Sequence, residues 1–432
     1  MKINWFSPLP PAKTGIADYM TCILPALIKN CQLELWTNQT IYDRELNNYV
    51  KVNSYHRNNI MWSKINQADI NIYHIGNNPD FHEDIWRISC QCPGIVVLHD
   101  LKLQDFFGGI YRELNQDKVG YINQMHRYYG IEGALAAEMW WNQEVSMQFM
   151  ADNYPLTPLA LKNAIGVITH SQESYCQLQK EQELLTAYIP LPYPSFGCSS
   201  NQENQREKGF YQLIVFGHIG KNRCVDMILD ALARFSQKQA FRLDIYGELW
   251  DSNYLVQKIN SLNLNNLVTL HGFVTEAKLE NALANADLAI NLRYPTMGEA
   301  SVSQLQIWSH GLPSLVTKIG WYSELPENTV GYVTVGNEIA DLHQHFSQFL
   351  HDPQSYQTIG KNGQIWLENN HSPESYAKAL VDFAREACQQ RYRYAANYFI
   401  EKVGKEISYW NDDQISDLEL KSLAETIHFL TS

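Results

Sequence analysis

Basic and acidic side chains lie beside an apolar run in the second half of the chain. Arg293 and Glu299 stand between the apolar run 288–292 and the helical pattern 301–310. The unpaired N–H groups at the start of a helix, together with the helix dipole, favour an anion, and a nearby guanidinium neutralises phosphate oxygens. These residues therefore predict a binding site for a diphosphate group.

A second basic segment follows another apolar run. Lys221 and Arg223 come shortly after residues 211–216. Two cations at this point can pair with an anionic ligand. A solvated pair of loop charges is the structural alternative, because Lys and Arg side chains are mostly exposed in proteins.

Three segments of the first half end apolar runs and can contact a ligand. His99 is followed by Asp100, which can orient the imidazole ring, although a histidine at a strand end is often structural. Gly15 lies in a loop where the lack of a Cβ atom lets backbone approach a ligand. The segment 76–79, followed by His82, ends a third run, and its Asn-Asn-Pro sequence is also typical of a plain turn.

Short apolar runs alternate with helical patterns along both halves, which predicts parallel sheets covered by helices. The predicted strands are 2–7, 33–36, 70–75, 94–99, 164–169, 211–216, 241–246, 267–271, 288–292 and 313–317. The predicted helices include 16–28, 84–89, 100–112, 132–150, 225–235, 255–262, 276–285 and 301–310. Ligands of such doubly wound α/β sheets bind beyond the carboxyl ends of the strands.

The polar stretch 201–208 separates the two series of strands and is the predicted linker. We therefore predict a domain over residues 1–200, a second domain over 201–390, and a site in the cleft between them. Residues 391–432 are predicted to be helical and to cross back onto the first domain.

Four stretches, each at a predicted strand end, carry a resemblance to a known family. They are FSPLPPAKTGIADY (6–19), VLHD (97–100), FGHIGKNR (216–223) and LRYPTMGEAS (292–301). In this order they resemble the retaining glycosyltransferases of family 4, which have the GT-B fold of two Rossmann-like domains. The resemblance extends to about residue 386. It implies transfer of a sugar from a nucleoside-diphosphate sugar, such as a UDP- or GDP-sugar, to an acceptor hydroxyl with retention of the anomeric configuration.

The resemblance also implies roles for individual residues. The catalytic group comprises His99, Glu299, Arg223 and Arg293. In the family pattern, cations in the loop of Lys221 and Arg223 compensate the charge that grows on the leaving phosphate, and Arg223 is the first choice for this role. The donor-binding group comprises Gly15, Gly217, His218, Lys221, Gly247, His271, Gly272, Phe273, Val274, Gly298, Ala300, Ser301 and Gln306. The acceptor-side group comprises Asp18, Asn77, Asn78, His82 and Asp100.

The sequence departs from the family pattern at several of these positions. His218 takes the place of an arginine, and Cys224 the place of a glycine. Counting back from Gly311, the family's ribose-binding glutamate falls on Gln306 and its first acidic residue on Gly298, one before Glu299. Gln306 can still donate to and accept from a diol. A helix-end role for Glu299 is the structural alternative.

No cofactor and no metal ion are expected, because the sequence has no cluster of metal ligands and no Asp-x-Asp pattern. The resemblance implies that the leaving phosphate helps to take the acceptor's proton. Two alternatives remain open. One is a nucleotide-sugar epimerase on the same scaffold, and the other is a catalytically idle sugar-nucleotide-binding or scaffolding subunit, which the departures motivate.

The net charge of −13 argues against nucleic acid as a partner. The sequence shows no apolar run of about 18 residues and no signal peptide, so we expect no transmembrane segment. A cytoplasmic location is predicted, with peripheral attachment to a membrane left open. The predicted partners are a nucleotide sugar and an acceptor that is a glycan, a lipid, a small molecule or a protein.

Overall fold

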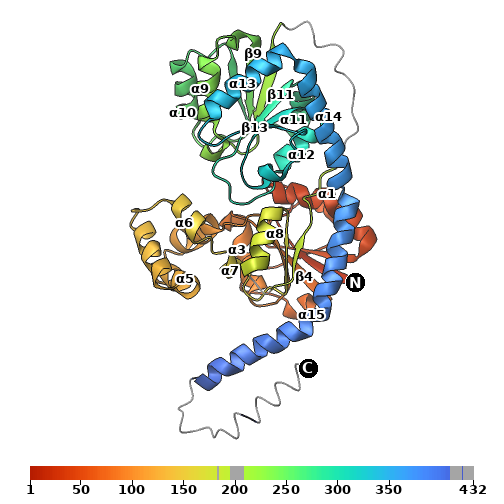
Figure 1. Cartoon of the computed structure of the whole chain (residues 1–432). Helices are drawn as coiled ribbons and strands as arrows, with labels where there is room; N and C mark the ends of the chain where they lie inside the picture. The colour runs from red at the N-terminus through yellow and green to blue at the C-terminus, as the bar shows by residue number, and fades with distance from the viewer. Residues whose placement is uncertain (182–183, 195–208, 409–420, 422–432) are drawn as a thin grey trace. The chain divides into compact units, whose positions relative to one another are not determined.

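The computed structural model describes residues 1–181, 184–194, 209–408 and 421. The chain divides into two compact units (Figure 1). Unit 1 comprises Met1–Thr169, Tyr175–Ile189 and the chain from Ala377, and unit 2 comprises His170–Ser174 and Pro190–Tyr376. Helix α15 (Pro373–Ser408) begins in unit 2 and continues in unit 1. The predicted linker 201–208 lies outside the described residues.

Unit 1 is built on a seven-stranded sheet with the order β3-β2-β1-β4-β5-β6-β7. All of its strand pairs are parallel. The strands are β1 (Lys2–Phe6), β2 (Gln32–Thr37), β3 (Lys51–Ser54), β4 (Ile70–Ile75), β5 (Ile95–Leu98), β6 (Gly166–Thr169) and β7 (Thr186–Tyr188). Strands β1, β4 and β5 are almost wholly buried, as expected for strands with helices on both faces.

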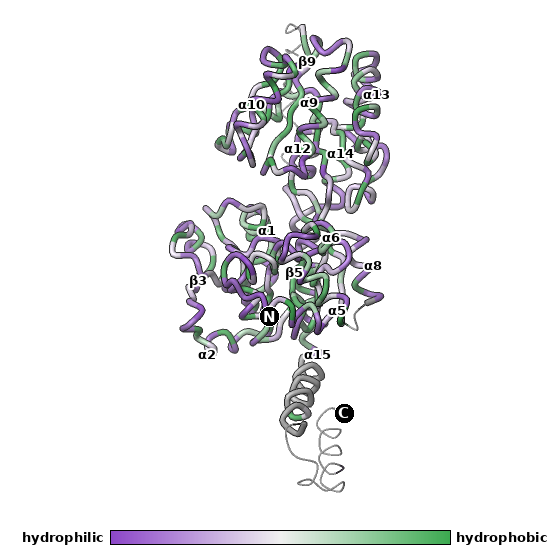
Figure 2. Tube along the Cα trace, turned by 90° about the vertical axis from the view of Figure 1, so that its left-hand side faces the viewer, coloured by the Kyte–Doolittle hydropathy of each residue, from purple (hydrophilic) through white to green (hydrophobic). Residues whose placement is uncertain are grey.

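The helical segments of unit 1 connect these parallel strands. They are α1 (Gly15–Asn30), η1 (Arg44–Asn48), α2 (Trp62–Ile65), α3 (Pro79–Ser89), α4 (Gln104–Gly108), η2 (Gly109–Leu114), α5 (Lys118–Trp141), α6 (Met147–Asn153), α7 (Thr157–Ala160) and most of α8 (Gln172–Glu181). In Figure 2, green hydrophobic stretches run through the middle of each unit, and purple hydrophilic stretches lie mainly on outer segments.

Unit 2 has a six-stranded parallel sheet with the order β10-β9-β8-β11-β12-β13. Its strands are β8 (Tyr211–Phe216), β9 (Phe241–Tyr246), β10 (Val268–Gly272), β11 (Leu288–Asn291), β12 (Ser314–Thr317) and β13 (Gly331–Val333). Its helical segments are η4 (Lys221–Arg223), α9 (Val225–Arg234), η5 (Lys238–Ala240), α10 (Ser252–Ser261), α11 (Glu276–Ala284), α12 (Val302–Ser309), η6 (Gly320–Glu324), α13 (Glu338–His351) and α14 (Pro353–Asn370).

The core of unit 2 follows the two-residue period of its strands. On β8, Leu213 and Val215 pack into the cluster that contains α9, α10 and α13, while Ile214 and Phe216 face α11 and α12. Successive side chains of a strand point to opposite faces. This alternation fixes the register of the strand and therefore the direction of the residues that follow it.

Each sheet reverses its strand order at one point. In unit 1 the reversal lies between β1 and β4, and in unit 2 between β8 and β11. Open α/β sheets bind ligands beyond the carboxyl ends of the strands at such a switch point. The residues just after these four strands are therefore the first place to look for a site.

The structure corrects several predicted elements. Strands β3, β7 and β13 were not predicted. The single helix predicted over 132–150 is wrong, because the chain forms α5 and α6, and Gly130 inside α5 has a non-helical φ of 65°. The helix predicted over 100–112 is α4 followed by the wider turns of η2.

Candidate functional site

Two loops meet at the switch point of unit 2. The loop after β8 leads to Arg223, and the loop after β11 begins with Leu292 and Arg293. The N–H group of Tyr294 donates to the carbonyl oxygen of Asn222 at 2.8 Å, which ties the two loops together. The sequence-predicted Arg223, Arg293, Gly298, Glu299, Ala300 and Ser301 are thus brought to one region.

Arg223 is a buried cation held by neutral groups. Only 5% of the residue is exposed. Its Nη1 donates to Asn291 Oδ1 at 2.5 Å and its Nη2 to Ser303 Oγ at 3.1 Å, while its buried Nε has no partner. Among the described residues no carboxylate forms a salt bridge with it.

The surroundings of Arg223 disfavour its charge. Burial, followed by the positive charge of Arg293, lowers the pKa of Arg223 to about 10. The group therefore remains protonated at neutral pH, and its charge is only partly offset by Glu299, which forms its ion pair with Arg293 instead. A buried, unpaired charge costs several kcal/mol, and an anionic ligand removes part of that cost.

Arg293 and Glu299 form an ion pair across the loop after β11. Arg293 Nη1 donates to Glu299 Oε1 at 2.7 Å. The other carboxylate oxygen of Glu299 accepts from Thr296 Oγ1 at 2.9 Å and from the Met297 N–H group at 2.7 Å. Glu299 therefore shapes the turn in which Gly298 has a φ of +86°. Most of its hydrogen-bonding capacity is used within the loop.

Helix α12 begins directly after this turn. Ser301 is its N-cap and accepts from the Gln304 N–H group at 3.2 Å. The N–H groups of Val302 and Ser303 precede the first hydrogen bonds of the helix, which is the usual property of a helix start. Ser303 is also the partner of Arg223, so the guanidinium reinforces the positive end of the helix dipole.

A buried network lies beneath the start of α12. Gln304 is fully buried, its Oε1 accepts from Asn291 Nδ2 at 3.0 Å, and its Nε2 donates to Ser314 Oγ at 2.7 Å. Asn291 in turn accepts from Arg223. This network joins β11, β12 and α12 and fixes the direction of the Arg223 side chain.

The predicted donor-site residue Gln306 faces helix α11 instead of the loop. Gln306 Nε2 donates to Glu280 Oε1 at 2.8 Å, and His310 Nε2 lies 2.6 Å from Glu280 Oε2. The hydrogen bond from His310 is the main cause that lowers the pKa of Glu280, and the bond from Gln306 adds to it. A carboxylate thus stands beside Gln306, although it comes from a different helix.

Three glycines line the carboxyl ends of β8, β9 and β10. Gly217, Gly247 and Gly272 all have positive φ angles, 109°, 128° and 65°. A Cβ atom on Gly247 would lie 1.8 Å from the carbonyl oxygen of Gly217, so this position admits only glycine. The close approach of the two strand ends is therefore one reason for Gly247, independent of any ligand.

The other predicted donor-side residues follow these glycines. His271 stacks on Tyr246 with ring centroids 4.1 Å apart, and its Nε2 lies 3.1 Å from Asp244 Oδ1. Phe273 is exposed, and Val274 packs against the core beside α11. Between His271 and Phe273 in the chain, the backbone at Gly272 is open, because a Cβ atom there would meet nothing within 4 Å.

His218 and Lys221 are the most exposed members of the predicted set after β8. The Nζ atom of Lys221 lies 4.8 Å from the ring centroid of Trp250. Cys224, which occupies the family's glycine position, has a φ of +53°. That left-handed backbone explains why glycine is the usual residue there.

In unit 1, Gly15 begins helix α1 at the carboxyl end of β1. Thr14 is the N-cap and accepts from the Ile16 N–H group at 3.3 Å. Asp18 lies in the first turn, where a carboxylate complements the helix dipole. These residues stand on the β1 side of the switch point of this sheet.

The ring of His99 contacts a second histidine that was not among the predicted residues. His99 Nε2 lies 2.9 Å from Nδ1 of His74, a fully buried residue of β4. The ring of His74 packs on Trp5 with centroids 4.2 Å apart. His74 therefore fixes the orientation of the His99 ring from below.

The segment after β4 is held by local bonds. Asp100 Oδ2 accepts from the Asn77 N–H group at 2.8 Å, and Asn77 Oδ1 accepts from the Phe106 N–H group at 2.9 Å. Asn78 is the N-cap of α3 and accepts from the Asp80 N–H group. His82 is buried, and burial lowers its pKa to about 4, so it is neutral at pH 7. Asn78 and His82 therefore have structural roles here.

Sequence reasoning missed several polar residues that organise these regions. They are His74, Glu280, Asn291, Ser303 and Gln304. Asn291 and His74 offered a signal, because each is a polar residue within a largely apolar, buried strand. Buried polar side chains are hydrogen-bonded in most proteins, so such residues point to a network.

Within the described ranges no three His, Cys, Asp or Glu side chains gather in a way that could hold a metal ion. In the same part of the chain, no helix combines the length and the apolar character needed to span a bilayer.

Two Rossmann-type parallel sheets followed by a helical C-terminal segment define the GT-B fold, and solved structures confirm this assignment. HepE of Anabaena, determined in complex with UDP, covers 89% of this chain and 100% of its own, with a TM-score of 0.62 at 15% identity. The match to sucrose-phosphate synthase of Thermosynechococcus elongatus covers 89% of this chain and 98% of the synthase chain, also with a TM-score of 0.62 at 15% identity. The match to WaaG, a glycosyltransferase involved in lipopolysaccharide biosynthesis, covers 87% of this chain and 99% of the WaaG chain, with a TM-score of 0.58 at 13% identity.

The sequence itself matches a family model over part of its length. Residues 199–366 match the model of the group 1 glycosyl transferases. The matched stretch includes the strands β8 to β13 and the loops that carry Arg223, Arg293 and Glu299. A comparison with curated protein sequences gives no match.

Proposed function

We propose that this protein is a glycosyltransferase that transfers a sugar from a nucleoside-diphosphate sugar to an acceptor hydroxyl. One observation carries the proposal: Arg223 is buried without a carboxylate partner and donates to Ser303 in the first turn of α12. A cation and a helix start that converge at a switch point favour a phosphate group. The match of residues 199–366 to the group 1 glycosyl transferases supports this reading.

The diphosphate is proposed to bind at the N–H groups of Val302 and Ser303. Arg223 acts from behind this helix start, where its charge stabilises the leaving phosphate more strongly than a solvated cation would. Arg293 lies on the loop side and is held in place by Glu299. HepE has been solved with UDP and with UDP-glucose, which makes a UDP-sugar the first donor to test.

The transfer is proposed to proceed with retention and without a metal ion. In this scheme the leaving phosphate takes the proton of the acceptor hydroxyl as the new glycosidic bond forms on the same face. His99 is proposed to contact the transferred sugar. Glu299 is proposed to orient sugar hydroxyls with the lone pairs that its loop bonds leave.

A second candidate function follows from the bonds of Glu299. Because both of its carboxylate oxygens are engaged by Arg293, Thr296 and Met297, the chain could bind a nucleotide sugar without transferring it. Product analysis distinguishes the two candidates. Formation of a glycoside from a UDP-sugar would exclude a catalytically idle subunit. Binding of the donor without any product would exclude a glycosyltransferase.

The test is calorimetric titration of the full chain with UDP, GDP and ADP, followed by an assay of nucleotide release from the matching sugars with and without acceptors. The anomeric configuration of the product is then read by NMR. We expect binding of one nucleoside diphosphate that is weakened in Arg223→Met. The proposal would be overturned if none of the three nucleotides binds, or if neither Arg223→Met nor Arg293→Met weakens the binding.

A further inference from the structure

Unit 1 contains a cavity of about 290 Å³ that none of the residues discussed above for donor or acceptor lines. It lies between the loop that follows β3 and one face of helix α3. On the helix its lining residues stand at i, i+3 and i+4, so they share one face. Gln91 follows the end of the helix. The lining residues are Arg57, Asn58, Ile60, Asp84, Arg87, Ile88 and Gln91.

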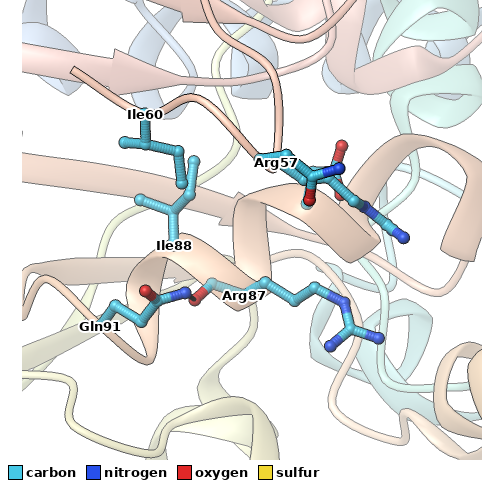
Figure 3. Close-up of a pocket in the computed structure, with 7 residues that line it drawn as sticks. Arg57, Ile60, Arg87, Ile88 and Gln91 are labelled. Atoms are coloured by element: carbon cyan, nitrogen blue, oxygen red, sulfur yellow. Dashed lines mark hydrogen bonds and ion pairs between the residues drawn. The ribbon is translucent and has the colours of Figure 1, made fainter. Parts of the chain in front are cut away.

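The floor of the cavity is apolar. Figure 3 shows the side chains of Ile60 and Ile88 directed toward each other, one from the loop and one from the helix. Ile88 belongs to the hydrophobic core of unit 1, and Ile60 packs against the same cluster. Because Ile88 is only 1% exposed, a flat apolar face of a ligand would meet mainly Ile60, which the core supports.

The rim is polar, preorganised and electrically balanced. Arg57 bridges Glu83 at 2.9 Å and Asp84 at 3.0 Å, and Arg87 contacts Glu83 at 2.6 Å. Two guanidinium charges are thus offset by two carboxylates. The side-chain amides of Asn58 and Gln91 complete the rim, and Gln91 can both donate and accept.

These properties select the chemistry of a ligand. A phosphate or a sulfate would need an excess of positive charge, which the balanced rim does not provide. A purely apolar ligand would cover the exposed amides and guanidinium groups of the rim without replacing their hydrogen bonds to water. A neutral ring with one apolar face and hydroxyl groups around its edge fits this cavity, because the face can contact the apolar floor and the hydroxyls the polar rim. A pyranose has this form. The volume lies at the lower limit of about 300 Å³ for small-molecule sites, which suits a single ring.

We propose that this cavity binds one sugar ring of a glycan acceptor, away from the ring that reacts. The inference rests on the proposed function and names the acceptor class as an oligosaccharide. Helix α3 starts at Pro79, beside Asn77 and the other residues at the carboxyl ends of the strands. Arg87 lies about 12 Å further along the helix, at 1.5 Å per residue. Asn38, which directly follows β2, donates to Asp84 at 2.9 Å and connects the cavity with the same edge of the sheet.

The experiment is a titration of the full chain, labelled at isoleucine δ1-methyl groups, with maltotriose, cellotriose and mannotriose. Ile60→Val and Ile88→Val assign the two floor signals. We expect at least one trisaccharide to shift both signals in a saturable way, and the double variant Asn58→Ala/Gln91→Ala to weaken binding by at least fivefold. Gln67→Ala, an exposed glutamine of the same unit, is the matched control and should bind as the parent does.

Three results would overturn the inference. They are the absence of shifts at Ile60 and Ile88 with all three trisaccharides, equal binding by the double variant, and the same shifts on addition of inorganic phosphate. Nucleotide binding to unit 2 is measured separately in each sample. Saccharide binding without nucleotide binding would support the sugar site in the cavity and contradict the proposed donor site. Nucleotide binding without saccharide binding would support the donor site and contradict the sugar site.

Discussion

The Nδ1 atom of His74 lies 2.9 Å from the Nε2 atom of His99, so the N–H group of one ring donates a hydrogen bond to the bare nitrogen of the other. His74 is fully buried in β4, whereas His99 follows β5 at the carboxyl edge of the sheet. The orientation of a candidate sugar-contacting residue is therefore set by a neighbour that no ligand can reach.

Replacement of His74 by Phe should slow transfer without weakening nucleotide binding. The ring keeps its packing against Trp5, but the hydrogen bond to His99 is lost. Such a bond contributes about 0.5–1.5 kcal/mol, which corresponds to a decrease in kcat of up to about tenfold. Steady-state kinetics measure the effect. His74→Asn, whose amide can replace the ring nitrogen, should restore part of the rate, and an unchanged kcat in His74→Phe would refute a positioning role.

Replacement of Arg223 by Met should separate binding from stability. Loss of hydrogen bonds to a charged group costs about 1.5–3 kcal/mol, or roughly 10- to 150-fold in the Kd for the nucleoside diphosphate. The free energy of unfolding should change little, because removal of a buried charge without a salt bridge offsets the lost hydrogen bonds to Asn291 and Ser303. Calorimetry and urea denaturation measure the two quantities. Arg234→Met on the exposed end of α9 is the control, and a large loss of stability in Arg223→Met would mark that residue as purely structural.

Two glycines with positive φ should respond differently to alanine. In Gly247→Ala the new Cβ atom would overlap the carbonyl oxygen of Gly217, whereas in Gly272→Ala it meets open space. We expect a cost of about 1–2 kcal/mol for Gly272→Ala, which is the usual penalty for left-handed backbone. A larger loss is expected for Gly247→Ala. Urea denaturation measures both, and equal losses would contradict the close approach of the β8 and β9 ends.

The interaction of Glu280 with His310 and Gln306 should give a pH-dependent contribution to stability. The pKa of Glu280 is lowered in the folded state. Its contribution is therefore fully present above the unfolded pKa of about 4.3 and is lost as the pH falls through the lower folded value. The difference in unfolding free energy between the parent and Glu280→Gln should reach about 0.2–1 kcal/mol at pH 6–7 and shrink below pH 4. A difference that grows on acidification would contradict this assignment.

Transfer activity should persist in EDTA. The proposed site stabilises the leaving diphosphate with Arg223, Arg293 and the start of α12, so it needs no divalent ion to offset the charge. The rate of nucleotide release is measured before and after chelation. Loss of the rate in EDTA that Mn²⁺ restores would reject metal independence.

The sequence predicted elements best where the chain is apolar and short. Strands β4, β8 and β9 have the predicted bounds of 70–75, 211–216 and 241–246. Strand β3 escaped notice because its sequence, Lys-Val-Asn-Ser, has little apolar pattern. Its pairing with β2 and the bonds of Lys51 and Asn53 to Glu34 make it a strand, and these depend on tertiary structure.

The residues of the candidate site divide in a similar way. Arg223 and Arg293 were named from short segments that resemble a family. Asn291 and Gln304 were not named, because their role arises only when β11, α12 and Arg223 come together. The Asn291–Arg223 bond joins residues 68 apart in the chain, and no local pattern records it. Asn78, which was predicted on the acceptor side, also caps α3 with its side chain.

Unit 1 is discontinuous in sequence, and this fixes the order in which the protein can mature on the ribosome. Its last part begins at Ala377, and Phe383 from that part packs where a Cβ atom at Gly166 would lie 3.1 Å away. The intervening residues Pro190–Tyr376 of unit 2 must be synthesised first. At about 5–20 residues per second, the early strands of unit 1 wait roughly 10–40 s for that segment. During that interval the surface at Gly166 that Phe383 later covers remains open to solvent.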